Sequence, residues 1–120
     1  MITTKRGLVR AVRKAMERQK WRRAASPHGG CLYRKTPQTG CAIGCLIPAA
    51  KYKPEFEDVG SLARADALSI SINPTGQRAI LKAAGIAESL RAEARQLQIA
   101  HDNAISSADW KARFEAWART

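Results

Sequence analysis

The apolar run from Cys41 to Ile47, with the sequence CAIGCLI, most constrains how this chain can fold. It has no charged or amide side chain at any position, so both faces of an element built from it must be covered. A short run of this kind, ended by Pro48, is typical of a strand that is central in a sheet or sandwiched between layers. Gly44 inside the run indicates a bulge or the close approach of another backbone.

The residues before this run complete a predicted β-hairpin over about residues 31–47. Cys31–Arg34 predicts a first short strand, and Lys35–Gly40 has the proline and glycine chemistry of a turn. Leu68–Ile72 alternates and is consistent with a third strand. The sequence therefore predicts an α+β fold, in which a basic N-terminal helix and three to four further helices surround a small antiparallel β-hairpin or three-stranded sheet.

The first helix is expected over about residues 4–24, with Thr3 or Thr4 as its N-cap. Its apolar residues recur at helical spacing and form one face: Leu8, Val9, Val12, Ala15 and Met16. We expect this face to dock on the rest of the domain, with the polar side of the helix directed outward.

The C-terminal part, about residues 74–119, is expected to be helical. Asn73-Pro74 begins a helix that stops at Gly85, and a second helix runs from Glu88 to Ile105. Ser106, with Asp109 three residues later, predicts a capping box for the last helix. Two apolar stripes are expected to pack inward, one of Leu90, Ala94, Leu97, His101, Ala104 and Ile105, and one of Trp110, Phe114 and Trp117.

Length and composition favour one domain over residues 1–120, with no membrane span. The chain has 120 residues, enough for a modest core, and no apolar run approaches the roughly 20 residues that a spanning helix needs. The basic N-terminus lacks an apolar signal region, so a structural first helix is preferred to a targeting segment. Three cysteines are too few for a disulfide framework, which favours a reducing cytosol.

The positive charge is concentrated at the start of the chain. Residues 1–35 contain eleven Lys and Arg residues against the single acid Glu17, and so carry +10 of the net charge of +11. This asymmetry suggests a polyanionic partner, which could be nucleic acid, an acidic protein face or a phosphorylated ligand, although a solvated cationic helix is the alternative.

The candidate binding residues lie on the outer side of the first helix and around the predicted hairpin. Trp21 is either exposed for stacking on a base or folded back into the core, and the core alternative is preferred. No helix-turn-helix, ribbon–helix–helix or zinc-finger pattern is present, so binding is expected to be mostly electrostatic. The candidates are Arg6, Arg10, Arg13, Lys14, Arg18, Trp21, Arg22, Arg23, Arg34 and Lys35.

A zinc site is the alternative role of the cysteines. Zinc prefers four Cys or His ligands in a tetrahedron, and four such residues lie within 18 positions: His28, Cys31, Cys41 and Cys45. On an extended strand, however, Cys41 and Cys45 would lie about 13 Å apart, so one metal could join them only if the chain bent at Gly44. Buried apolar thiols are therefore preferred, and no cofactor is expected.

His101 is expected to face the interior, whereas Asp102 is expected to point elsewhere. A buried neutral histidine bonded to a backbone carbonyl is the usual outcome. The alternatives make His101 a metal ligand beside the cysteines or the base for a cysteine nucleophile, but no orienting residue or oxyanion site is evident.

Several of these residues resemble a group of short proteins encoded in tailed-phage and prophage genomes. The likeness covers about residues 31–58 and 97–117, and it is most specific at GCAIGCLIP. It rests on Cys31-x-Tyr33-Arg34, Gly40–Pro48, Tyr52, Pro54-Glu55, Glu57, Leu97-Gln98-x-x-His101-Asp102 and Trp110-x-x-x-Phe114. The resemblance implies an accessory protein in the bacterial host cytoplasm and brings no catalytic or binding roles with it.

We therefore expect a non-enzymatic phage or prophage accessory protein that binds a host macromolecular complex or nucleic acid through its basic helix. Inhibition of a bacterial defence system fits that context. The alternatives are a sponge for a nucleotide or cyclic nucleotide, and a Cys-dependent or zinc-dependent enzyme. The sequence leaves the oligomeric state open.

Overall fold

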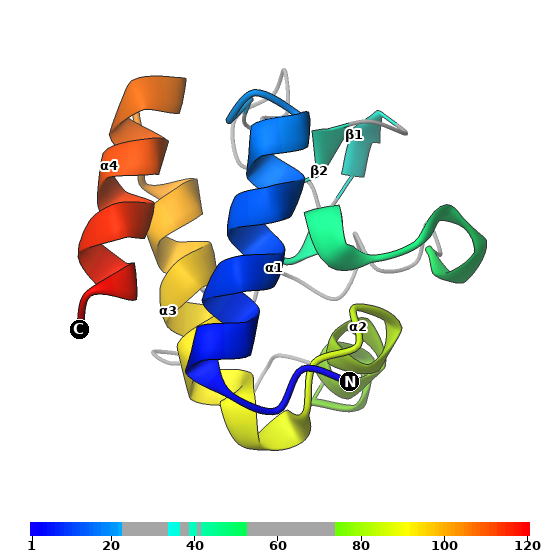
Figure 1. Ribbon diagram of the computed structural model, residues 1–120. Coiled ribbons are helices and arrows are strands. Elements are labelled where there is room, and N and C mark those ends of the chain that lie inside the picture. The colour runs from blue at the N-terminus through cyan, green and yellow to red at the C-terminus, as the bar shows by residue number, and fades with distance from the viewer. Residues whose placement is uncertain (23–33, 37–38, 41, 53–73) are drawn as a thin grey trace.

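Helix α1 (Lys5–Arg18) lies between two groups of segments (Figure 1). On one side are α3 (Arg91–Asp102) and α4 (Ser107–Ala118), which pack against each other. On the other side is the 3-10 helix η1 (Gly44–Leu46), which contacts α1 directly. Helix α2 (Pro74–Ala83) lies near the N-terminus of the chain.

The structure is a computed structural model of the chain, and it describes residues 1–22, 34–36, 39–40, 42–52 and 74–120. The remaining elements in these ranges are short: the 3-10 helices η2 (Ala49–Lys51) and η6 (Glu88–Leu90), and the strands β1 (Arg34–Thr36) and β2 (Thr39–Gly40). Across the same ranges, the helices are all too short or too polar to span a membrane.

The predicted α+β fold is wrong, because the described part of the chain is mostly helical. β1 and β2 form a short antiparallel ladder in which Arg34 lies opposite Gly40 and Thr36 opposite Thr39. This ladder is not a sheet around which helices pack, since the described core comes from helices and the turns between them. The proposed third strand at Leu68–Ile72 lies outside the described residues.

The apolar run that predicted a central strand is a turn instead. Ile43 has helical backbone angles (φ −95°, ψ −39°), and the N–H groups of Leu46 and Ile47 donate to Ile43 O and Gly44 O at 3.0 and 3.1 Å. The predicted burial is confirmed in part: Ala42, Ile43 and Ile47 are buried, whereas Cys45 and Leu46 are partly exposed and Cys41 lies outside the described residues. A short run without polar positions has no readable period, so it cannot distinguish a strand from a helical turn.

Helix α1 begins as expected and ends earlier than expected. The Thr4 hydroxyl accepts a hydrogen bond from Gly7 N at 3.0 Å and caps the helix. The helix stops at Arg18, not near residue 24, because Lys20 and Trp21 adopt left-handed backbone angles (φ 57° and 59°). Trp21 N then donates to Met16 O at 2.8 Å, which turns the chain back toward the core.

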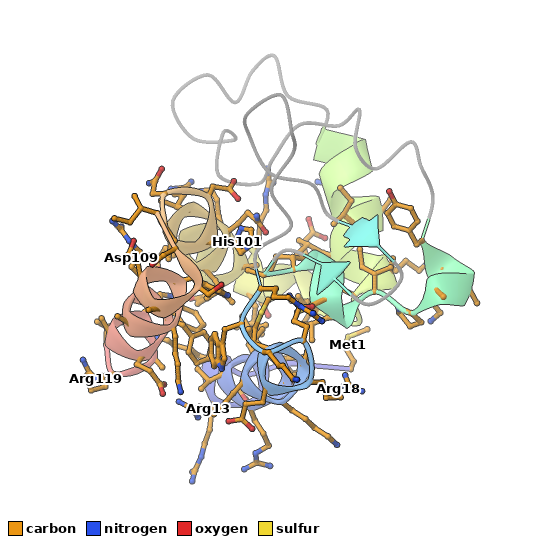
Figure 2. All side chains as sticks on the ribbon, turned by 90° about the horizontal axis from the view of Figure 1, so that it is seen from above. Met1, Arg13, Arg18, His101, Asp109 and Arg119 are labelled. Carbon is orange, nitrogen blue, oxygen red and sulfur yellow. The ribbon has the colours of Figure 1, made fainter. Side chains whose placement is uncertain are left out.

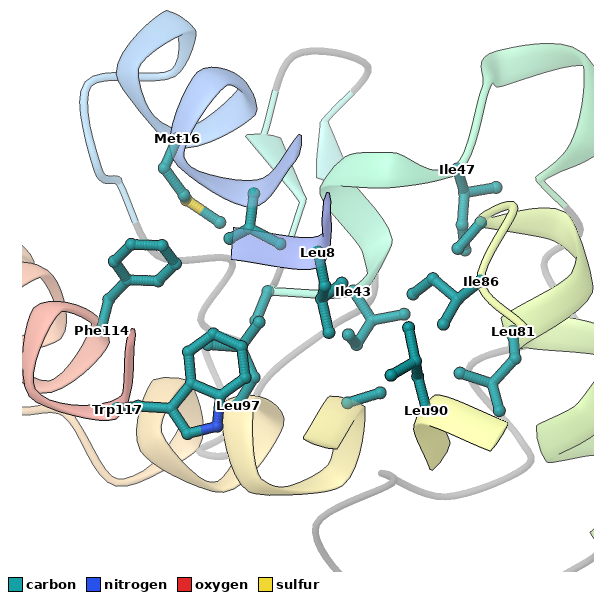
Figure 3. Close-up of a cluster of buried hydrophobic side chains, with 14 of the residues drawn as sticks. Leu8, Met16, Ile43, Ile47, Leu81, Ile86, Leu90, Leu97, Phe114 and Trp117 are labelled. Carbon is teal, nitrogen blue, oxygen red and sulfur yellow. The ribbon is translucent and has the colours of Figure 1, made fainter. Parts of the chain in front are cut away.

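Aromatic and aliphatic side chains from α1, α3 and α4 fill the centre of the core (Figure 3). Trp110 Nε1 donates to Met16 Sδ at 3.3 Å and links α4 to α1. The largest fully buried apolar side chains are Trp110, Phe114, Leu8, Met16, Ile43, Ile80, Leu81 and Leu97.

The predictions for the C-terminal helices are largely confirmed. Gly85 (φ 74°) ends α2, where Ile86 N donates to Leu81 O at 2.9 Å. Ser106 Oγ accepts from Asp109 N at 3.0 Å and caps α4, and Asp109 Oδ2 accepts from Ile105 N at 3.0 Å. The long helix is shorter than predicted: it starts with η6 and ends at Asp102. Ile105, assigned to the inward stripe, is 84% exposed because the helix has ended before it.

Candidate polyanion-binding surface on α1

Four cations of α1 follow each other at intervals of four residues on its outer side: Arg6, Arg10, Lys14 and Arg18. We call them the basic row. All four side chains are exposed, whereas Leu8, Val12, Ala15 and Met16 of the same helix are buried. Residues four apart on a helix are neighbours on its surface and are separated by about 6 Å along the axis. In Figure 2, long side chains of α1 extend away from the other helices.

The positive charges of the basic row have no carboxylate partner within the ranges that the structure describes. The ion pairs of Arg and Lys found there join Arg13 to Glu115, Arg78 to Glu88 and Arg113 to Asp109. None of these involves a member of the row. Glu17 is the one acidic residue of the same helix, so four cations against one carboxylate leave α1 with a positive potential that attracts polyanions.

Arg13 differs from the row, although the sequence grouped it with the binding candidates. Its guanidinium forms an ion pair with Glu115 of α4 and lies over the Phe114 ring, 5.3 Å from the ring centroid. Arg13 therefore joins α1 to α4, and its charge is compensated within the fold.

Trp21 is a core residue, as the preferred alternative predicted. It is 8% exposed, and it makes edge-to-face contacts with Trp110 and Phe114 at centroid distances of 6.0 and 5.3 Å. Lys111 Nζ lies 5.6 Å from the Trp21 ring centroid. The indole therefore stabilises the junction of α1 and α4 and offers no exposed face on which a base could stack.

The other binding candidates lie at or beyond the end of α1. Arg22 is exposed, and its Nε donates to Gln19 O at 3.0 Å, while Gln19 Nε2 donates to Arg22 O at 2.7 Å. Arg23 lies outside the described residues, and Arg34 and Lys35 lie in β1. The structure thus brings together Arg6, Arg10, Lys14 and Arg18 as one surface.

The sequence did not indicate that a pocket adjoins this surface. The space between α1 and the segment Cys45–Ala49 has a volume of about 470 Å³, and its wall on the α1 side is formed by Ala11, Lys14 and Arg18. No local motif marks such a pocket, because it arises only where the turn after β2 packs on α1.

Only part of the zinc alternative falls within the described residues. His28, Cys31 and Cys41 lie outside them. Cys45 is partly buried in η1, and its Sγ lies 3.2 Å from Ala42 O, as a donor to that carbonyl. Because Cys45 sits in a 3-10 turn, the separation of about 13 Å expected on a strand does not apply. The described ranges hold no group of three His, Cys, Asp or Glu residues that could share a metal ion.

His101 faces the interior, as predicted, but its partner is a carboxylate. The ring is fully buried and lies edge-on to Trp110 at a centroid distance of 5.2 Å. His101 Nδ1 lies 3.0 Å from Asp102 Oδ1, and this oxygen also accepts a hydrogen bond from Gln98 Nε2 at 2.8 Å. The expectation that Asp102 points elsewhere is therefore wrong.

Gln98 connects this polar group to the turn before η1. Its Oε1 accepts a hydrogen bond from Ile43 N at 3.4 Å, and its side chain is buried. Gln98 and Asp102 are one helical turn apart on α3, so both reach the same side of the helix. This polar group holds α3 against the apolar turn.

Comparisons of the chain with protein-family models, with curated proteins and with solved structures found no match.

Proposed function

We propose that this chain is a non-enzymatic binding protein whose basic row engages the phosphate backbone of nucleic acid. One observation carries the proposal: the row presents four exposed cations, spaced at one helical turn, without a carboxylate partner in the described part of the chain. Lys and Arg side chains arranged in this way neutralise successive phosphates and release their counterions.

The dimensions of the row suit a short stretch of backbone. Arg6 and Arg18 are twelve residues apart in one continuous helix, so the row is about 18 Å long. Each of its four cations can meet one phosphate of a strand that follows the row. Four contacts of this kind make binding strongly dependent on salt, with a slope of log K against log salt of about −3 for single strands and about −4 for duplexes.

The nature of the exposed side chains favours nucleic acid over an acidic protein face. The centre of a protein–protein interface is usually apolar and rich in aromatic residues. The exposed large apolar side chains in the described ranges are Met1 and Ile105, and neither belongs to α1. A cationic surface without an apolar centre is typical of electrostatic binding to phosphates.

The resemblance to short phage and prophage proteins supports a biological context for this activity. We propose that the chain acts in the cytoplasm of a bacterial host, where binding to nucleic acid, alone or within a host complex, blunts a defence system. Capture of partners from infected cells with and without nuclease tests this context. A partner that stays bound after nuclease treatment would identify a protein as the direct target and contradict binding through nucleic acid.

The direct test of the basic row reverses two of its charges. We expect Arg10→Glu/Arg18→Glu to weaken binding to an oligonucleotide at least about tenfold and to reduce the salt slope by about 2. The matched control Lys82→Glu/Arg119→Glu makes the same change in net charge at exposed positions on α2 and just after α4. Equal loss of affinity in both variants would show that net charge alone attracts the nucleic acid, and would contradict a site on α1.

A further inference from the structure

The pocket beside the basic row combines two cations with a facing wall of uncharged residues. Lys14 and Arg18 of the row stand on the α1 side together with Ala11, and the facing wall is the segment Cys45–Ala49. That wall is formed by Cys45, Leu46, Ile47, Pro48 and Ala49, none of which carries a charge. Its volume is about 470 Å³, and it is a broad depression open to solvent, not an enclosed cavity.

A base joined to phosphates has the chemistry that this pocket complements. The apolar wall suits the flat face of a heterocycle, and the cations at the rim suit the phosphates on either side of it. Lys14 and Arg18 also belong to the basic row, so a strand lying along the row would pass the mouth of the pocket.

We propose, on the basis of the nucleic-acid binding argued above, that this pocket receives one unpaired base of a single strand while Lys14 and Arg18 hold the adjoining phosphates. A paired base is stacked inside a duplex and reaches such a pocket only by flipping, which requires the base to be unpaired and unstacked. The pocket therefore gives the protein a preference for single-stranded over double-stranded nucleic acid, which the basic row alone does not provide.

The pocket wall offers few free backbone N–H groups with which to read the identity of the base. The backbone N–H groups of Leu46 and Ile47 already donate to Ile43 O and Gly44 O, and Pro48 has no N–H. Pro48 O accepts hydrogen bonds from Lys51 N and Tyr52 N at 2.9 and 3.1 Å. With these groups engaged, the base is held by its face, so we infer little dependence on base identity.

Two substitutions fill the pocket from opposite walls without removing a cation. Ala11→Phe acts from α1 and Ala49→Phe from η2. We expect each to weaken binding of a short single-stranded oligonucleotide at least about fivefold, while affinity for the same sequence annealed to its complement changes less than about twofold. Ala112→Phe, at an exposed position of α4, is the matched control and should change neither affinity.

Cys45 provides a second measurement on the protein without substitutions. Its thiol lines the pocket, so a bound base should slow its alkylation, followed at Cys45 itself by fragment-ion mass spectrometry, because Cys41 lies in the same tryptic peptide. The single strand should protect Cys45, and the duplex should not. Because this measurement needs no variant, it also tests the base pocket if both phenylalanine variants fail to fold.

The outcomes separate this inference from the proposed function. If the chain binds neither single strands nor duplexes, both are overturned. If it binds the two forms equally through the basic row, and neither pocket substitution nor Cys45 alkylation distinguishes them, the base pocket is overturned and binding by the row stands.

Discussion

The guanidinium of Arg13 on α1 is paired with the carboxylate of Glu115 on α4, at the partly exposed edge of the junction between the two helices. The same guanidinium lies over the Phe114 ring. Arg13 is adjacent in sequence to Lys14, which belongs to the basic row, yet the two cations have different surroundings. Neighbouring cations on one helix can thus have different roles: one stabilises the fold, and the other is available to bind a ligand.

Arg13→Ala should lower stability without removing nucleic-acid binding. An ion pair that is partly exposed and a cation–π contact together contribute about 1 kcal/mol to the free energy of unfolding. Affinity for an oligonucleotide should fall less than about threefold, whereas Lys14→Ala should weaken it more and leave stability nearly unchanged. Urea unfolding and fluorescence anisotropy measure the two quantities. A larger loss of affinity in Arg13→Ala than in Lys14→Ala would place Arg13 in the binding surface.

Trp21→Ala should destabilise the protein strongly. The indole is buried against Trp110 and Phe114, and removing a buried tryptophan side chain typically costs about 3–5 kcal/mol. Trp21→Phe keeps an aromatic contact and should cost less. If Trp21→Ala unfolded at the same urea concentration as the unsubstituted protein but lost oligonucleotide binding, the stacking role considered for Trp21 would be correct after all.

Lys20→Gly should stabilise the protein by about 0.5–1 kcal/mol. Lys20 adopts φ 57°, a conformation that costs a residue with a Cβ about 1–2 kcal/mol. Glycine avoids this cost, but part of the benefit is offset because glycine gives the unfolded chain more conformational freedom. Lys20→Ala removes the same charge but keeps the Cβ, so it serves as the control. Equal stability of the two variants in urea would show that the left-handed conformation carries no strain.

Local signals predicted the ends of helices better than the fold class. Thr4, Gly85 and Ser106 act through their own side chains or backbone freedom, so each could be recognised from a few neighbouring residues. The end of α1 could not, because Lys20 and Trp21 adopt left-handed angles in a turn that buries Trp21 against α4, a contact remote in the sequence.

The candidate site was predictable only in part, for a related reason. Arg6, Arg10, Lys14 and Arg18 follow from helical periodicity alone. The pairing of Arg13 with Glu115 and the pocket beside Ala11 both depend on tertiary packing of segments far apart in the chain. The apolar run shows the limit most clearly: its burial follows from composition, whereas its turn conformation depends on what packs around it.

The turn at Gly44 also sharpens the prediction about zinc. Within the described residues, Cys45 Sγ donates to Ala42 O and His101 Nδ1 lies beside Asp102, whereas the buried His101 Nε2 has no hydrogen-bond partner there. The same ranges hold no three His, Cys, Asp or Glu side chains that could share a metal ion. We therefore expect elemental analysis of the purified protein to find no stoichiometric zinc, and a chelator to leave the thermal unfolding midpoint unchanged. A structural zinc site would behave differently, because metal binding contributes directly to folding free energy and its removal would lower that midpoint sharply. One zinc ion per chain, together with such a drop, would restore the ligand set of His28, Cys31, Cys41, Cys45 and His101 as the hypothesis to pursue.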